Sequence, residues 1–185
     1  DCPGDPSTRE RHVRLVLRVT RSEVGRMNPE LIETELLVIG LESTSRAPSV
    51  ATDVHAQGEM AGRLNLPARI PNQIDPGTHL IVLWNWHPEN EFQAMTAVAV
   101  SAADVAAVEE LPPECRVYRF PMCKFAVFPM SGRMPDLIEP WEEIRAWYPD
   151  GMDANTTTIR KYYDAQRTGE IWIPMDPHLE PELLS

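Results

Sequence analysis

The order of apolar segments repeats along the chain, and this repeat constrains the fold more than any other feature. A β-type run, a helical pattern and two further β-type runs fill residues 35–101, and the same order returns over residues 115–175. Helices in such an arrangement normally cover one face of an antiparallel sheet. The sequence therefore predicts an α+β fold of two βαββ modules, with helices on one face and a groove between the halves.

Turn residues and hydrophobic alternation mark the elements of each module. Asp53 can cap the first helix, and Asp75-Pro76-Gly77 is a strong turn signal between that helix and the next strand. Pro121 is expected to break a strand, and Pro140 allows the second helix to begin late. We expect strands over residues 35–44, 79–87, 92–101, 115–120, 124–130, 157–164 and 170–175, and helices over residues 53–64 and 136–148.

The domain boundaries follow from shifts in composition. Residues 1–33 are expected to form an N-terminal extension, with a strand over residues 12–20, and residues 34–176 the folded domain. The halves of that domain run from about residue 34 to 101 and from about 114 to 176, and residues 177–185 form an acidic, proline-rich tail.

Charge and cysteine content exclude several classes of function. The formal net charge of −11 argues against unaided binding to nucleic acid, whose phosphates need a basic surface. The three cysteines, Cys2, Cys115 and Cys123, form neither a disulfide framework nor a zinc motif, which favours a reduced, cytoplasmic setting. No apolar stretch approaches the about 20 residues that span a bilayer. The common nucleotide, zinc and serine-hydrolase motifs are absent from the sequence, so no cofactor and no metal are expected.

The last predicted strand combines a carboxylate with an indole. Alternation places Glu170 and Trp172 on one face, with Ile171 and Ile173 on the other. A carboxylate beside a flat aromatic side chain suits an organic cation, by Coulomb attraction and by stacking. The alternative is an edge strand whose glutamate simply lies in solvent.

Other aromatic residues are candidates for the same site. Trp84 and Trp86 alternate onto one strand face and could join Trp172 as walls of an aromatic box, although each alone is more often a core residue. Tyr162 shares a face with Arg160 and could donate to a ligand or act as a general acid; alternatively it packs in the core with its hydroxyl at the rim. Tyr163 points the other way and is expected in the core.

Three motifs together resemble the GyrI-like effector-binding domain, which also serves as the ligand domain of AraC- and MerR-type multidrug regulators. They are FPMCKFAVF at residues 120–128 followed by Gly132, the pattern W-x-x-I-x-x-W-Y-P at residues 141–149, and the closing EIWIP at residues 170–174. The resemblance covers residues 94–175. It implies a duplicated βαββ fold with a pseudo-twofold groove, and ligands that are bulky, hydrophobic and often cationic.

The resemblance also implies roles for single residues. Glu170 matches the acidic residue of the groove, Tyr162 the tyrosine before the final hairpin, and Trp84 and Trp86 the aromatics of the first half. Arg160 departs from the pattern, because the family usually has an acid there, and strong dication binding is therefore not expected. Cys123 stands where a glycine is common. The candidate ligand-binding residues are Glu170, Trp172, Tyr162, Trp84, Trp86 and Phe128.

Three functions remain open at this point. The first is a stand-alone binding protein for hydrophobic, cationic small molecules, a monomer or homodimer, since residues 1–33 are too few for a helix-turn-helix module. The second is a hydrolase that opens reactive, cyclopropane-type alkylating natural products, with Glu170 activating water and Tyr162 assisting as catalytic residues. The third is a protein-interaction module, such as a gyrase-inhibitor-like protein.

Overall fold

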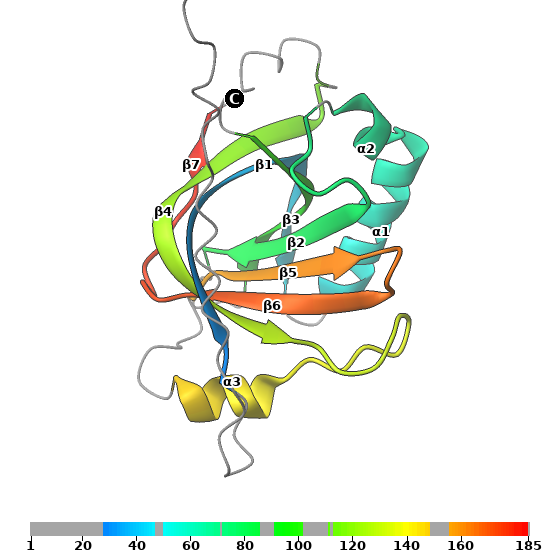
Figure 1. Ribbon diagram of the computed structural model, residues 1–185. Helices are drawn as coiled ribbons and strands as arrows, with labels where there is room; N and C mark the ends of the chain where they lie inside the picture. The colour runs from blue at the N-terminus through cyan, green and yellow to red at the C-terminus, as the bar shows by residue number, and fades with distance from the viewer. Residues whose placement is uncertain are drawn as a thin grey trace, which may run out of the picture.

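The computed structural model describes residues 28–46, 50–70, 72–85, 91–101, 111, 113–148 and 156–184. The predicted strand over residues 12–20, Trp86 and the turn at residues 149–151 lie outside this part of the chain. Figure 1 shows a strongly curved sheet with helices on its outer side. The two predicted βαββ modules follow one another along the chain, which confirms the α+β fold.

The first module contains β1 (Glu30–Arg46), α1 (Val50–Arg63), the short α2 (Leu66–Arg69), β2 (Thr78–Trp84) and β3 (Glu91–Val100). The second contains β4 (Cys115–Pro129), α3 (Trp141–Trp147), β5 (Thr158–Tyr163) and β6 (Thr168–Pro174), and the two-residue β7 (Glu182–Leu183) follows it.

The sheet closes on itself. Its strand order is β1-β3-β2-β5-β6-β4-β7, and β1 also pairs with β4, so six strands form a barrel with β7 on its outside edge. The two modules meet along two antiparallel ladders, β1–β4 and β2–β5, in which Val38 pairs with Tyr118 and Leu80 pairs with Lys161. The two halves therefore form the wall of one barrel with buried side chains inside it, and the expected groove between the halves stays a prediction.

Alternation along the strands sorts the side chains into an inner and an outer core. The inner cluster fills much of the barrel and includes Val38, Val82, Phe120 and Phe125, each fully or almost fully buried. The outer face carries three further clusters: one lies under α1 and α2, one lies between β4, β6 and α3, and a smaller one lies on β2 and β3. The helices thus cover the outer face only, as the sequence predicts (Figure 1).

Pro121 gives a different outcome from the one expected, whereas Pro140 begins the second helix late, as the sequence allows. β4 continues through Pro121, where a break was predicted, because β4 has one extra residue opposite Glu35 of β1, and this bulge accommodates a residue without an N–H. Pro140 is the N-cap of α3, which therefore begins at Trp141, several residues later than the earliest predicted start. In the first module α1 begins at Val50, so Asp53 lies in its first turn and does not cap it.

The C-terminal segment is part of the fold. Leu179 is 6% exposed and belongs to the inner cluster, and its carbonyl accepts a hydrogen bond of 2.7 Å from Thr157 Oγ1. Further on, β7 pairs with β4 through Tyr118 and Arg119. None of the helices in the described segments is long and apolar enough to cross a membrane.

Candidate functional site

Glu170 lies on the inner face of β6 and is partly buried. Its Oε2 atom accepts one hydrogen bond from Tyr163 Oη at 2.8 Å and one from Trp172 Nε1 at 3.0 Å. Trp172 is two residues further along the same strand and packs against the inner cluster, as alternation predicts. The carboxylate is therefore held by two aromatic donors, in the setting that can stabilise a cation.

Lys161 already places a positive charge against the rings of Tyr163 and Trp172. The backbone of Lys161 lies opposite that of Glu170 in the β5–β6 ladder. Its Nζ lies 5.1 Å from the ring centroid of Tyr163 and 5.4 Å from that of Trp172. The same Nζ forms an ion pair with Asp75. The Lys161 side chain is only 10% exposed, whereas that of Asp75 is 47% exposed.

We refer to Glu170, Trp172, Tyr163, Lys161 and Asp75 as the Glu170 cluster. It contains two carboxylates and one ammonium, so it keeps a negative charge in excess when all three groups are ionised. Sequence reasoning missed Lys161 and Asp75. The signal for Lys161 was present, because alternation with Ile159 points its side chain into the barrel, yet a lysine is rarely buried.

The Glu170 cluster lies at one end of the barrel. Tyr163 is the last residue of β5 and pairs with Thr78, the first residue of β2, while Glu170 pairs with Pro129, the last residue of β4. Asp75, in the turn before β2, is half exposed, so the cluster reaches the surface at this residue.

Tyr162 lies on the opposite face from Glu170. In the β5–β6 ladder it pairs with Gly169, and its ring stacks on His79 with centroids 4.9 Å apart. Burial raises its pKa, while the nearby Arg160 charge acts in the opposite direction. The predicted pair of Glu170 and Tyr162 is therefore not brought together, and the tyrosine that meets Glu170 is Tyr163, which the sequence assigned to the core.

Arg160 also faces outwards, so it does not reduce the negative charge around Glu170 as was expected. Its guanidinium pairs with Glu139 and lies 5.4 Å from the ring centroid of Trp141. Burial acts to raise the pKa of Glu139, but the hydrogen bonds and charge of Arg160 outweigh it and hold that pKa below its ordinary value. Lys161, the next residue, is the cation that faces Glu170.

Two other predicted residues belong to hydrophobic packing. Phe128 is fully buried on the outer face, where Trp147 of α3 meets it edge to face with centroids 5.7 Å apart. Trp84 is 5% exposed and lies in the inner cluster, but at the other end of β2 from Thr78. Trp86 lies outside the described residues.

Trp84 belongs to a second arrangement of a carboxylate, a tyrosine and a tryptophan. Its ring meets Tyr118 edge to face at 5.1 Å, and Tyr118 Oη donates a hydrogen bond of 2.9 Å to Glu42. Burial first, and then the contact with Glu42, raises the pKa of Tyr118 to about 12. Each end of the barrel thus carries a glutamate that accepts a hydrogen bond from a tyrosine hydroxyl, with an indole next to the pair.

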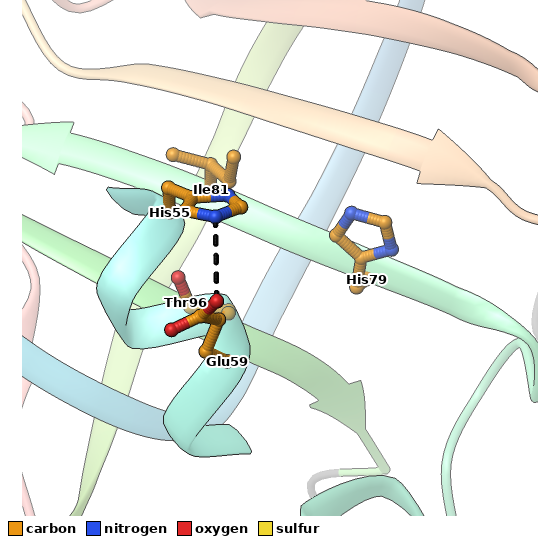
Figure 2. Close-up of a pocket in the computed structure, with 6 residues that line it drawn as sticks. His55, Glu59, His79, Ile81 and Thr96 are labelled. Carbon is orange, nitrogen blue, oxygen red and sulfur yellow. Dashed lines mark ion pairs between the residues drawn. The ribbon is translucent and has the colours of Figure 1, made fainter. Parts of the chain in front are cut away.

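A cavity of about 430 Å³ lies on the outer face, between α1 and the strands β2 and β3. Figure 2 shows His55 of α1 joined to Glu59 by the dashed line of an ion pair, whereas His79 stands apart on β2. His55 Nε2 lies 3.5 Å from Glu59 Oε1, and His79 Nδ1 lies 3.1 Å from Asp164 Oδ1. In the segments that the structure describes, no three potential metal ligands come together here or elsewhere.

Comparison with known proteins identifies a family for the sequence and solved structures with a similar fold. A family model described as "Cass2: Integron-associated effector binding protein" matches residues 33–175. The sequences of curated proteins give no match.

Solved structures share the fold at low sequence identity. SAV2435, determined bound to tetraphenylphosphonium, has a TM-score of 0.60 and 17% identity, and the match covers 80% of this chain and 93% of that one. The integron cassette protein VCH_CASS2, from the mobile metagenome of Vibrio cholerae, has a TM-score of 0.53 and 18% identity, with coverage of 80% and 95%. At such identities the likeness shows a common fold.

Proposed function

Because the chain belongs to the family of integron-associated effector-binding proteins, and so carries a GyrI-like effector-binding domain, we propose that it binds a hydrophobic, cationic small molecule at the Glu170 cluster. The observation that carries this proposal is the Glu170 carboxylate, which is partly buried and held by the hydrogen bonds of Tyr163 and Trp172. Membership of the family supports binding of a small-molecule effector, and the cluster supports its cationic character.

The chemistry of the cluster favours a lipophilic cation over other ligands. A carboxylate that is partly removed from water attracts a cation more strongly than one in bulk solvent, because the effective dielectric constant is lower. The faces of Trp172 and Tyr163 already hold an ammonium at 5.4 and 5.1 Å, which are distances typical of cation–π contacts. The related structure of SAV2435 with tetraphenylphosphonium supports the idea that such a fold can accommodate a lipophilic cation.

The ligand would enter at the end of the barrel where Asp75 is exposed. Its apolar groups would then contact the inner cluster next to Trp172, which includes Phe125 at a centroid distance of 5.8 Å. Burial of apolar surface would supply affinity, and Glu170 would select for charge.

Titration with tetraphenylphosphonium tests the proposal. Binding is followed by calorimetry and by quenching of tryptophan fluorescence, in the wild type and in Glu170→Gln. We expect the variant to bind at least about tenfold more weakly, which corresponds to about 1.4 kcal/mol. Glu142→Gln, on the exposed side of α3, has the same change in net charge and should bind as the wild type does.

Two results would contradict the proposal. Equal affinity in Glu170→Gln and in the wild type would show that the carboxylate does not hold the cation. Conversion of an electrophilic cyclopropane by the wild type, lost in Glu170→Gln, would indicate the hydrolase alternative.

We place this binding in the cytoplasm, in a resistance or sensing role. The support is the state of the two cysteines that the structure describes, since Cys115 and Cys123 are both free thiols.

A further inference from the structure

The ammonium of Lys161 lies against two aromatic rings of the Glu170 cluster. These rings belong to Tyr163 and Trp172, the two side chains that also donate to the Glu170 carboxylate. A lysine side chain that is only 10% exposed is unusual, and the chain has only two lysines, Lys124 and Lys161. Lys124 is exposed on β4.

We propose that Lys161 is the specificity-determining residue of this site: a tethered ammonium that a cationic ligand must displace, so that binding exchanges one cation for another. This inference rests on the proposed function. It adds that the affinity for a ligand depends on how much more favourably the ligand cation binds at this site than the ammonium of Lys161 does.

Electrostatic repulsion prevents the ammonium of Lys161 and the cation of a ligand from occupying this position together. The rings of Tyr163 and Trp172 hold the ammonium of Lys161, and the same two side chains donate to Glu170. A second positive charge against these rings would repel the first. A ligand cation therefore gains the contacts that Lys161 loses.

Asp75 makes the displacement of Lys161 feasible. The carboxylate is half exposed and already pairs with the ammonium, so Lys161 can move outwards and keep this ion pair. The side chain has four flexible carbon–carbon bonds, and the movement requires no shift of β5. After the exchange, Lys161 and Asp75 neutralise each other, and Glu170 is left with one negative charge for the ligand. The exchange thus favours a monocation over a dication.

The first experiment removes the ammonium and keeps the length of the side chain. We expect Lys161→Met to bind tetraphenylphosphonium at least about tenfold more tightly than the wild type, and to bind the neutral triphenylphosphine oxide with unchanged affinity. Lys161→Arg keeps the cation and should show no gain. Lys124→Met is the matched control, since it changes the net charge equally at an exposed site and should bind as the wild type does.

The second experiment measures the displacement in the wild-type protein. Amine acetylation read by mass spectrometry should be slow at Lys161 and fast at Lys124, because only Lys161 is buried. Saturation with tetraphenylphosphonium should accelerate the acetylation of Lys161 and leave that of Lys124 unchanged. Thermal unfolding of each variant shows that it is folded.

The outcomes separate this inference from the proposed function. If Glu170→Gln weakens binding but Lys161→Met does not strengthen it, or if ligand leaves Lys161 as unreactive as before, the exchange is wrong and the binding function stands. If tetraphenylphosphonium binds neither the wild type nor Lys161→Met, both are wrong.

Discussion

The hydroxyl of Tyr163 lies 2.8 Å from the carboxylate of Glu170, although the two residues come from different strands. They meet because β5 and β6 form an antiparallel ladder in which Lys161 pairs with Glu170, so every second residue of β5 shares the face of Glu170. The neighbouring Tyr162 is excluded from that face by the same geometry. One strand therefore supplies a cation and a hydroxyl to the inner face and a stacked ring to the outer face.

Tyr163→Phe should destabilise the protein more than Tyr162→Phe. The first variant removes a donor to a partly buried carboxylate, which costs about 1–2 kcal/mol of the free energy of unfolding. The second keeps the ring that stacks on His79 and should change stability by less than about 0.5 kcal/mol. Urea unfolding measures both. Tyr162→Phe should also bind tetraphenylphosphonium as the wild type does. Weaker binding by this variant would indicate that the ligand lies on the outer face.

Leu179→Ala should lower the free energy of unfolding by about 2–5 kcal/mol. The side chain is 6% exposed within the inner cluster, so its removal loses apolar burial and leaves a cavity. Leu184→Ala is the matched control, because that side chain is 42% exposed and should cost little. Equal unfolding curves for the two variants would show that the C-terminal segment does not pack into the barrel in solution.

Gly40→Ala and Gly62→Ala should have opposite effects on stability. A Cβ at Gly40 would lie 2.0 Å from the carbonyl oxygen of Thr96 on β3, so β1 could not keep its present distance from that strand. A Cβ at Gly62 meets nothing within 4 Å, and alanine is favoured over glycine in a helix by about 1 kcal/mol. We expect a lower melting temperature, or loss of folding, for Gly40→Ala and a small increase for Gly62→Ala.

Acid should destabilise the outer face through Glu139. The pKa of Glu139 in the folded protein is below the ordinary value of 4.5. The ion pair with Arg160 therefore stabilises the folded protein above pH 4.5, and this stabilisation is lost as the pH falls through the folded pKa. The free energy of unfolding should therefore decrease as the pH drops below about 4.5.

Arg160→Met tests the origin of this pH dependence. The variant removes the partner that lowers the pKa of Glu139, so its stability should change less with acid than that of the wild type. Chemical unfolding at pH 7, 5, 4 and 3 provides the comparison. Parallel curves for the two proteins would assign the acid sensitivity to other carboxylates.

The order of elements and the sharing of faces within one strand could be predicted from sequence. Both depend on local periodicity, which is 2 residues in a strand and about 3.6 in a helix. The predicted βαββ repeat is observed, and Glu170 and Trp172 do share a face. The helix starts were less accurate, because the positions of Pro140 and Asp53 allow more than one first residue.

The neighbours of Glu170 were decided by tertiary structure alone. Which tyrosine meets the carboxylate depends on the register of β5 against β6, and a shift of one residue would exchange Tyr163 for Tyr162. The contact of Asp75 with Lys161 joins residues 86 positions apart, and the closure of the barrel depends on pairing between β1 and β4. The sequence determined what each segment can form, because local geometry is short-ranged. The site exists only because distant strands pair in one register, which no single segment specifies.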